Sequence, residues 1–380
     1  TSRAHTAIKI APNTEGAVVY VPDASRAVGV ATKLLSAEQR DGYMAEIVAE
    51  YEAVRAEHAG RKGATLVTLE EARANRFTWN EAFSPTIPNQ LGLQAITLEL
   101  EDIALFIDWS PFFQSWDLAG RYPAILENET VGETARQLYA DAKAMLARIV
   151  GENWLTARAV FGLYPARGDN EDIVIYSDEE RTRELTRWIG LRQQHKQPKG
   201  RFNVALADFV GERDYVGAFA VTAGLGIEAR VAEFEAAHDD YSAIMLKALA
   251  DRLAEAAAEW LHLRVRTYYW GYAGDESLDN DALIAEQYKG IRPAPGYPAC
   301  PDHTAKRELF ALLDAPANAG MGLTESCAMT PAASVSGFYI GHPAARYFAI
   351  PKIGRDQLED WAKRKGMSIK DAEYWLAPLL

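Results

Sequence analysis

The sequence predicts an α+β fold, in which helices and short strands share one chain of 380 residues. Apolar residues recur at helical spacing in several long stretches. Between these stretches lie short runs that are β-branched or aromatic and that are bounded by Gly, Pro or Asp. Hydrophobic residues make up 48% of the chain and charged residues 24%, as in a globular protein with a sizeable core.

The first 35 residues predict an extended lead-in. Residues 7–10 form a short strand-like run, which Pro12 and Gly16 interrupt. The chain starts at Thr1 without an initiator Met and without a signal-like apolar run, so we expect a fragment of a longer polypeptide.

Two helices are predicted in the first half of the chain. Ser36 and Gln39 have the spacing of a capping box, so a helix should begin there, and one apolar stripe along it predicts docking by one face. Gly60 and Gly63 are expected to end this helix. The second helix is predicted over residues 133–149.

The middle of the chain combines strands with the longest helical pattern. The predicted strands are residues 158–164, 172–176 and 215–222. The longest helix is predicted over residues 228–263, where apolar positions keep the helical period for many turns. The run 265–272 that follows is too aromatic for a surface loop. Two short helices are expected to start near Asp356 and Ser368.

The charge balance excludes some classes of partner. The chain has 53 acidic and 40 basic residues and a formal net charge of −13, so its long-range field repels phosphate backbones and anionic lipids. We therefore expect neither a nucleic acid nor a membrane as partner, whereas a cationic ligand is favoured. Only two cysteines are present, Cys300 and Cys327, which suits a reducing compartment, and we expect a cytoplasmic protein.

The most unusual segment is the proline-rich loop, residues 290–301. Its four prolines remove backbone donors and fix φ, so it can form neither a helix nor a central strand. A rigid loop can hold a ligand with little further loss of entropy, and the planar guanidinium of Arg292 suits a carboxylate. The alternative is a structural strap that packs Tyr297 and merely carries a surface Arg.

A second candidate is Asp108, which stands among five aromatic residues between positions 106 and 116. A carboxylate in apolar surroundings is costly without a partner. It could anchor an ammonium or sulfonium group, with cation–π attraction from the neighbouring rings. The alternative is a helix cap or an ion pair with a buried Arg.

Other patterns predict less. Gly224 and Gly226 follow a predicted strand and open a helix, as in the glycine fingerprint of dinucleotide-binding folds. That fingerprint needs a βαβ unit of roughly 30 residues, and here the following helix alone takes that length. Cys300 with His303 lacks further metal ligands, and Ser334 lacks the flanking glycines of a nucleophile elbow. We therefore predict no metal site and no catalytic side chain.

Several further motifs occur along the chain in a distinctive order. They are Ile107-Asp108-Trp109, Ala218-Phe219-Ala220-Val221-Thr222, His238-Asp239-Asp240-Tyr241, Tyr269-Trp270-Gly271-Tyr272, the run from Arg292 to Pro301, and Ala333-Ser334-Val335-Ser336-Gly337. Together they closely resemble the C-terminal activation domain of cobalamin-dependent methionine synthase. The resemblance extends from the lead-in to Trp375-Leu376-Ala377-Pro378.

The resemblance implies a bent, largely antiparallel sheet flanked by helices, with the proline-rich loop and the Asp108 segment meeting at a surface groove. It implies S-adenosylmethionine binding, and docking on the neighbouring cobalamin-binding domain when its cobalamin is oxidised to cob(II)alamin. Flavodoxin or a flavoprotein reductase would supply one electron, and S-adenosylmethionine the methyl group that regenerates methylcobalamin. The full-length methyltransferase could then convert homocysteine to methionine.

Carried over by position, the family's ligand contacts fall on a small set of residues. Asp108 would take the ligand's ammonium and Arg292 its carboxylate. Tyr347 would line the adenosine or sulfonium end of the ligand, and family members often have a second Tyr where this chain has Phe348. The expected ligand-binding set is Asp108, Arg292, Ala294, Gly296, Tyr297, Tyr347 and Phe348.

The resemblance also implies two parts in the chain. Residues 1–59 would be the tail of the cobalamin-binding module, its linker and a lead-in helix, and residues 60–380 the S-adenosylmethionine-binding activation domain. Without the homocysteine and folate modules, these 380 residues alone should not make methionine. Two alternative functions stay open: a nicotinamide-dependent oxidoreductase that uses Gly224 and Gly226, and a docking domain without a ligand of its own.

Overall fold

The computed structural model describes residues 3, 6–14, 16–21, 24–36, 38–60, 65–79 and 83–380. The chain divides into two compact units, Thr1–Thr65 and Leu66–Leu380. The division falls six residues beyond the expected boundary at 59/60. The assignment of the first unit to a cobalamin module stays a prediction.

The first unit is helical. Its elements are η1 (Thr6–Ile10), η2 (Ala11–Asn13), α2 (Ala24–Leu35) and α3 (Arg40–Gly60). The predicted strand at residues 7–10 is wrong, because this run forms a π-helical turn whose Ala7 carbonyl accepts a hydrogen bond from Arg55 of α3 (2.9 Å).

Two further expectations for this unit are wrong or shifted. The extended lead-in is wrong over α2, because residues 24–35 form a helix. Helix α3 begins at Arg40 rather than at Ser36, whose carbonyl accepts the Arg40 N–H (2.9 Å). The helix ends at Gly60 as predicted, and Gly63 lies outside the described residues.

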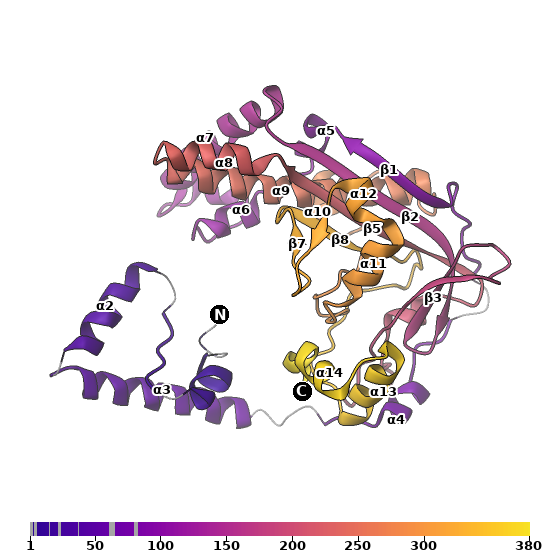
Figure 1. The fold of residues 1–380 in the computed structure, drawn as a ribbon, viewed down its shortest axis with the longest axis horizontal. Helices are drawn as coiled ribbons and strands as arrows, with labels where there is room; N and C mark the ends of the chain where they lie inside the picture. Colours follow the sequence, from indigo (N-terminus) through magenta and orange to yellow (C-terminus); the bar gives the residue numbers. More distant parts are fainter. Residues whose placement is uncertain are drawn as a thin grey trace. The chain divides into compact units, whose positions relative to one another are not determined.

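The second unit is built on an antiparallel sheet (Figure 1). Its strands are β1 (Gly92–Leu98), β2 (Thr156–Asp169), β3 (Asp172–Tyr176), β4 (Glu184–Trp188), β5 (Asp214–Leu225) and β8 (Ser334–Tyr339). The order is β4-β3-β2-β5-β8, with β1 also paired to β2. Two short strands, β6 (Gly322–Leu323) and β7 (Met329–Thr330), form a separate ladder. The α+β class and the antiparallel sheet are confirmed, and all three predicted strands are present.

Helices lie before, between and after these strands in the chain. They are α4 (Leu69–Ala74), α5 (Leu100–Ala104), α6 (Ser110–Ser115), η3 (Ala124–Glu127), α7 (Gly132–Gly151), η4 (Leu206–Phe209), α8 (Ile227–Ala236), α9 (Asp240–Arg264), η5 (Val265–Tyr269), α10 (Asn280–Ile284), α11 (Ala305–Leu313), α12 (Ala315–Ala319), α13 (Arg355–Lys365), α14 (Ile369–Trp375) and η6 (Ala377–Leu379). The predicted helix at 133–149 is α7. Ser368 caps α14 through the Asp371 N–H, whereas α13 begins after Gly354 and not at Asp356.

The single helix predicted over residues 228–263 is wrong, because two helices occupy this stretch. His238 adopts a φ of +57°, which the helical conformation excludes. The Asp239 carboxylate then accepts the Ser242 N–H (3.0 Å) and starts α9 anew. The apolar period continues through this break, so periodicity alone could not reveal it.

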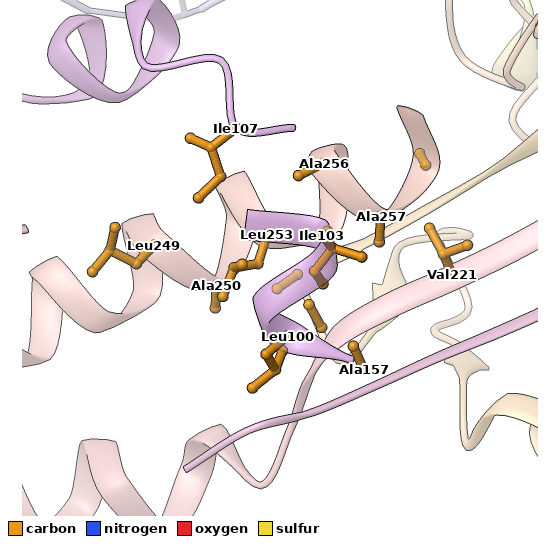
Figure 2. Close-up of a cluster of buried hydrophobic side chains, with 14 of the residues drawn as sticks. Leu100, Ile103, Ile107, Ala157, Val221, Leu249, Ala250, Leu253, Ala256 and Ala257 are labelled. Carbon is orange, nitrogen blue, oxygen red and sulfur yellow. The ribbon is translucent and has the colours of Figure 1, made fainter. Parts of the chain in front are cut away.

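Each face of the sheet packs against a different set of helices. Alternate residues of β5 point to opposite faces, so Phe219 and Val221 belong to one core and Ala218 and Ala220 to the other. The first core lies between the sheet and α9, with α5 wedged against both (Figure 2). The second core lies beneath α11 and α12. Helix α9 therefore lies against the middle of the sheet.

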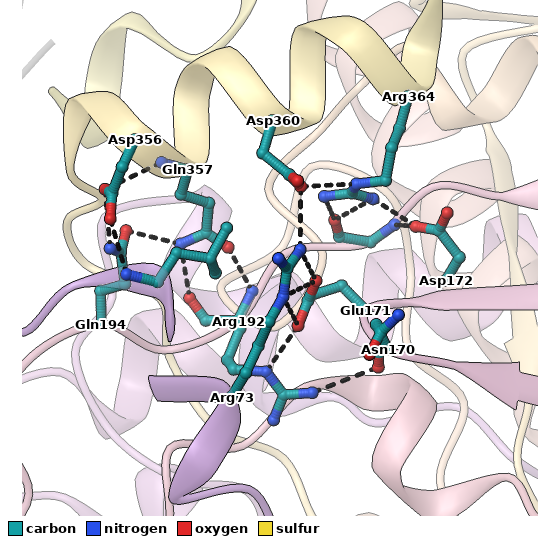
Figure 3. Close-up of polar contacts among 12 residues, drawn as sticks. Arg73, Asn170, Glu171, Asp172, Arg192, Gln194, Asp356, Gln357, Asp360 and Arg364 are labelled. Carbon is teal, nitrogen blue, oxygen red and sulfur yellow. Dashed lines mark hydrogen bonds and ion pairs between the residues drawn. The ribbon is translucent and has the colours of Figure 1, made fainter. Parts of the chain in front are cut away.

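A buried polar network ties α4 and α13 to the β2–β3 hairpin (Figure 3). Arg192, which is 0% exposed, donates to Glu171 (2.7 Å) and with both terminal nitrogens to Asp208 (2.8 Å each). Arg73 of α4 binds the same Glu171 (2.6 Å) and also Asp360 of α13 (3.1 Å). Charged groups as buried as these need such partners.

Among the described residues, no helix combines the length and apolar character needed to cross a bilayer.

Candidate functional site

The proline-rich loop runs beside the edge of the sheet next to β8. Ile291 and Ile340 exchange two backbone hydrogen bonds of 3.0 Å, and the Pro293 carbonyl accepts the Phe338 N–H (2.9 Å). The loop forms only isolated bridges and turns, as the prolines predict. These contacts fix the backbone at Arg292 relative to the sheet.

Across from the loop, helix α9 presents a row of acidic residues. Asp251, Glu255 and Glu259 are spaced four residues apart, with His262 one turn further on, so they share one face of the helix. Burial raises the pKa of Glu255, and the nearby guanidiniums partly oppose this shift. Burial also raises the pKa of Tyr297, and the charges of Glu255 and Asp251 add to it. The loop and the acidic row thus form one electrostatic environment.

Arg292 lies at the centre of this environment. Its Nη1 donates to Glu259 Oε2 (2.6 Å) and lies 3.4 Å from His262 Nδ1. Burial alone lowers the pKa of Arg292, but the Glu259 carboxylate together with Tyr288 and Tyr347 more than offsets this and raises it above the ordinary value. The side chain is 20% exposed, and its Nε and Nη2 have no hydrogen-bond partner among the described residues. A charged, planar donor edge is therefore available to a ligand.

Tyr347 meets Arg292 although 55 residues separate them in the chain. The Tyr347 hydroxyl accepts the backbone N–H of Arg292 (3.0 Å), and burial raises the pKa of this phenol. The ring is still 39% exposed. Phe348, the next residue, is half-buried and packs against the second core and the small core beneath α13. It supports the loop that carries Tyr347.

The remaining loop residues shape the backbone. Gly296 has a φ of +98°, and a Cβ there would lie 2.3 Å from Cε1 of His303. Ala294 accepts the Tyr297 N–H through its carbonyl (3.2 Å) and so closes a turn, while the Tyr297 ring is 62% exposed. Position 296 therefore has no room for a side chain.

Asp108 borders a cavity of about 670 Å³ next to α6 and α10. Its Oδ1 accepts the Ser110 N–H (2.9 Å) at the start of α6, a local contact close to the structural alternative, although Trp109 is the N-cap residue of this helix. The second oxygen has no hydrogen bond among the described residues. Ser110 and Arg121 line the same cavity.

One segment connects the two places. Asn280, Asp281 and Ile284 of α10 line the Asp108 cavity, and Tyr288 follows a few residues later with its ring 6.0 Å from the Arg292 guanidinium. No hydrogen bond or ion pair between described residues joins Asp108 to Arg292. The two candidates therefore border opposite ends of the segment 280–288.

Comparison with known proteins decides the family. A model of the family described as "Vitamin B12 dependent methionine synthase, activation domain" matches residues 99–366, which is more than half of the chain. The chain belongs to this family. Every element of the site described above lies within the matched residues.

A solved structure is also similar to this activation domain. Its description is "Crystal Structure of the MetH Reactivation Domain bound to AdoHcy". The sequences are 52% identical, the match covers 83% of this chain and 98% of the other, and the TM-score is 0.81.

The dinucleotide interpretation does not survive in this activation domain. Gly226 stands between β5 and α8 with a φ of +93°, but β5 pairs antiparallel with both of its neighbours, β2 and β8. A dinucleotide fold needs a parallel βαβ unit at this turn. The described residues also contain no cluster of His, Cys, Asp and Glu suited to a metal. Cys300 is buried, and burial raises the pKa of its thiol.

Sequence reasoning missed the groups that surround Arg292. Glu259 and His262 were not selected, because charged residues on a long helix are usually solvated. A signal was present: Glu259 directly follows Ala258 and His262 directly follows Leu261, and both of these apolar neighbours are fully buried. Charged or polar residues at such positions need a partner, and the nearby proline-rich loop supplies it.

Proposed function

We propose that this activation domain binds S-adenosylmethionine and its demethylated product, S-adenosylhomocysteine, beside Arg292. The observation that carries the proposal is the unpaired Nε and Nη2 edge of Arg292, which is aligned for a bidentate bond to an amino-acid carboxylate. The similarity to a reactivation domain that was crystallised with AdoHcy supports it. The acidic row on α9 suits the positive sulfonium and ammonium groups of the ligand.

In the proposed reaction the protein positions the ligand, and no side chain needs to transfer a proton. Cobalamin, held by the neighbouring domain of the full chain, is the methyl acceptor in the proposed reaction. Cob(II)alamin, one electron from flavodoxin or a flavoprotein reductase, and S-adenosylmethionine yield methylcobalamin and S-adenosylhomocysteine. Arg292 and Tyr347 would orient the ligand, and Asp108 would receive its ammonium. Regeneration of methylcobalamin would return the full-length methyltransferase to methionine synthesis.

The first test is calorimetric titration with S-adenosylmethionine, with NADH as the control ligand. We expect saturable binding of S-adenosylmethionine, no binding of NADH, and loss of binding in Arg292→Ala. Binding of NADH alone would revive the oxidoreductase alternative. No binding of either ligand would favour a docking domain without its own ligand.

A second variant tests the proposed ammonium contact. Asp108→Asn keeps the cap on Ser110 but removes the charge, so we expect weaker S-adenosylmethionine binding with cooperative melting retained. Asp102→Asn, an exposed acid on the nearby α5, is the matched control and should bind as the unmodified protein does. If Asp108→Asn loses cooperative melting instead, the residue is only a structural cap.

A further inference from the structure

A buried chain of alternating charges runs from Arg292 into the protein. Glu259 Oε2 binds Arg292 Nη1 at 2.6 Å, and Glu259 Oε1 lies 4.0 Å from Arg266 Nη1. On its far side Arg266 donates Nε and Nη2 to Glu276 (3.0 and 2.6 Å). The Glu259 side chain is 9% exposed and that of Arg266 is 0% exposed. Glu259 is thus held between two guanidiniums.

The partners of Arg292 are all on one side of its guanidinium. Nη1 carries two hydrogens; one points to Glu259 Oε2, and the other can be accepted by His262 Nδ1 at 3.4 Å. Burial and the two neighbouring guanidiniums hold the pKa of His262 well below its usual value, so the ring is neutral and has a lone pair to accept. The Nε and Nη2 hydrogens therefore face away from the protein network.

This arrangement of buried polar groups lowers the stability of the folded protein. Within the part of the chain that the structure describes, buried Glu259 Oε1, His262 Nε2 and Arg266 Nη1 have no hydrogen-bond partner, and neither has the hydroxyl of Tyr339. Buried polar atoms without partners are destabilising. Proteins keep such violations mainly at functional sites.

We infer that Glu259 is a positioning residue, which clamps Nη1 of Arg292 so that the Nε and Nη2 edge is presented to the carboxylate of S-adenosylmethionine. The inference rests on the proposed function and adds a residue to that site. Glu259 touches Arg292 and acts on the ligand only through it. A guanidinium on a free side chain would sample several rotamers, and fixing one of them before binding removes that entropy cost from association.

The variants separate geometry from charge. Glu259→Ala removes the clamp, and we expect S-adenosylmethionine to bind about tenfold more weakly. Glu259→Gln keeps an acceptor oxygen at the same distance and should restore affinity to within about threefold of the unmodified protein. Glu259→Asp keeps the charge but withdraws the oxygens by one methylene, so it should behave like Glu259→Ala and serves if the alanine variant does not fold.

The ligand pair gives a readout that a merely structural role would not move. Decarboxylated S-adenosylmethionine has the same sulfonium and adenosine groups but no carboxylate. We expect Glu259→Ala to leave its affinity unchanged. Glu286→Ala is the matched control, because Glu286 is exposed and lies close enough to influence the Arg292 charge without contacting it. This variant should bind both ligands normally.

The outcomes distinguish the inference from the proposed function. Equal weakening of both ligands by Glu259→Ala, or no weakening of either, would overturn the positioning role while S-adenosylmethionine binding stands. Failure of the unmodified protein to bind S-adenosylmethionine would instead overturn the proposed function, and the inference with it. Weakening confined to the carboxylate-bearing ligand, with recovery in Glu259→Gln, supports the inference.

Discussion

At the scale of single residues, the site depends on positions where only one side chain is compatible with the backbone. Gly296 combines a positive φ with a contact that leaves no room for a Cβ next to His303. Gly200 also has a positive φ (+83°), but nothing lies within 4 Å of its Cβ position. The two glycines therefore differ in steric space and not in conformation.

This difference makes a prediction. Gly296→Ala should lower the free energy of unfolding by about 1–3 kcal/mol and weaken S-adenosylmethionine binding, because the loop must shift away from His303. Urea denaturation and calorimetry measure the two effects. Gly200→Ala should lower the free energy of unfolding less, because only its positive φ is unfavourable for alanine, and it should bind S-adenosylmethionine normally. Equal losses in both variants would show that the His303 contact has no effect.

His342 provides a prediction about pH. Its ring lies 4.3 Å from Trp79 and 4.5 Å from Phe83, centroid to centroid, and burial lowers its pKa to about 4. Because the folded state resists protonation, stability is fully present above pH 6.5 and falls as the pH drops toward 4. We expect the unmodified protein to lose about 2 kcal/mol more between pH 7 and pH 5 than His342→Phe does. Identical pH profiles from urea denaturation would contradict this.

At the scale of elements, α9 links the core to the site. One side of the helix packs on the sheet and on α5 (Figure 2). Glu259 on another side binds Arg292 of the proline-rich loop. A shift of α9 along the sheet would move Glu259 relative to Arg292. The position of the site therefore depends on apolar residues that do not touch it.

Leu253 tests this dependence. It is fully buried beneath α5, and Leu253→Ala should lower the free energy of unfolding by about 2–5 kcal/mol through loss of contacts and the cavity left behind. Ile244 on the same helix is 54% exposed, and Ile244→Ala should cost about 0.5 kcal/mol or less. Urea denaturation compares the two variants. Similar costs for both would contradict the packing described for α9.

At the scale of the whole second unit, the buried network around Arg192 joins segments that are distant in sequence. Glu171 receives both Arg192 and Arg73, and Arg73 continues to α13 (Figure 3). Glu171→Gln would leave two buried or half-buried guanidiniums short of a carboxylate. We expect a loss of about 3–5 kcal/mol in the free energy of unfolding.

The control for this prediction is an exposed ion pair on α13, the helix that also carries Asp360. Glu359 binds Arg355 at 2.8 Å, with both side chains more than half exposed. Glu359→Gln should change stability by about 1 kcal/mol or less. Chemical denaturation of the two glutamine variants checks the contrast, and a mild effect of Glu171→Gln would mean that the network contributes little to stability.

Much of the fold could be predicted from local pattern. The strands at 158–164, 172–176 and 215–222 and the helix α7 were recognisable because side-chain periodicity follows directly from backbone geometry. Strands β1, β4 and β8 were not predicted. Burial alternates along β1, but Leu93 points outward and Gln94 inward, so its apolar residues do not follow the burial pattern. Strand β4 shows no alternation of burial. The break at His238 was also missed, because a single left-handed residue leaves the apolar period intact.

For the site, the sequence by itself determined the family, the rigid loop and the candidate Arg292. Each of these is recognised from short motifs of consecutive residues. Only the tertiary structure decided that Tyr347 and Glu259 meet Arg292, and that Asp108 borders a cavity lined by residues of α10. The reason is physical. Contacts between residues 33 to 55 positions apart depend on how α9 and the loop pack against one sheet, and local sequence carries no direct signal of that packing.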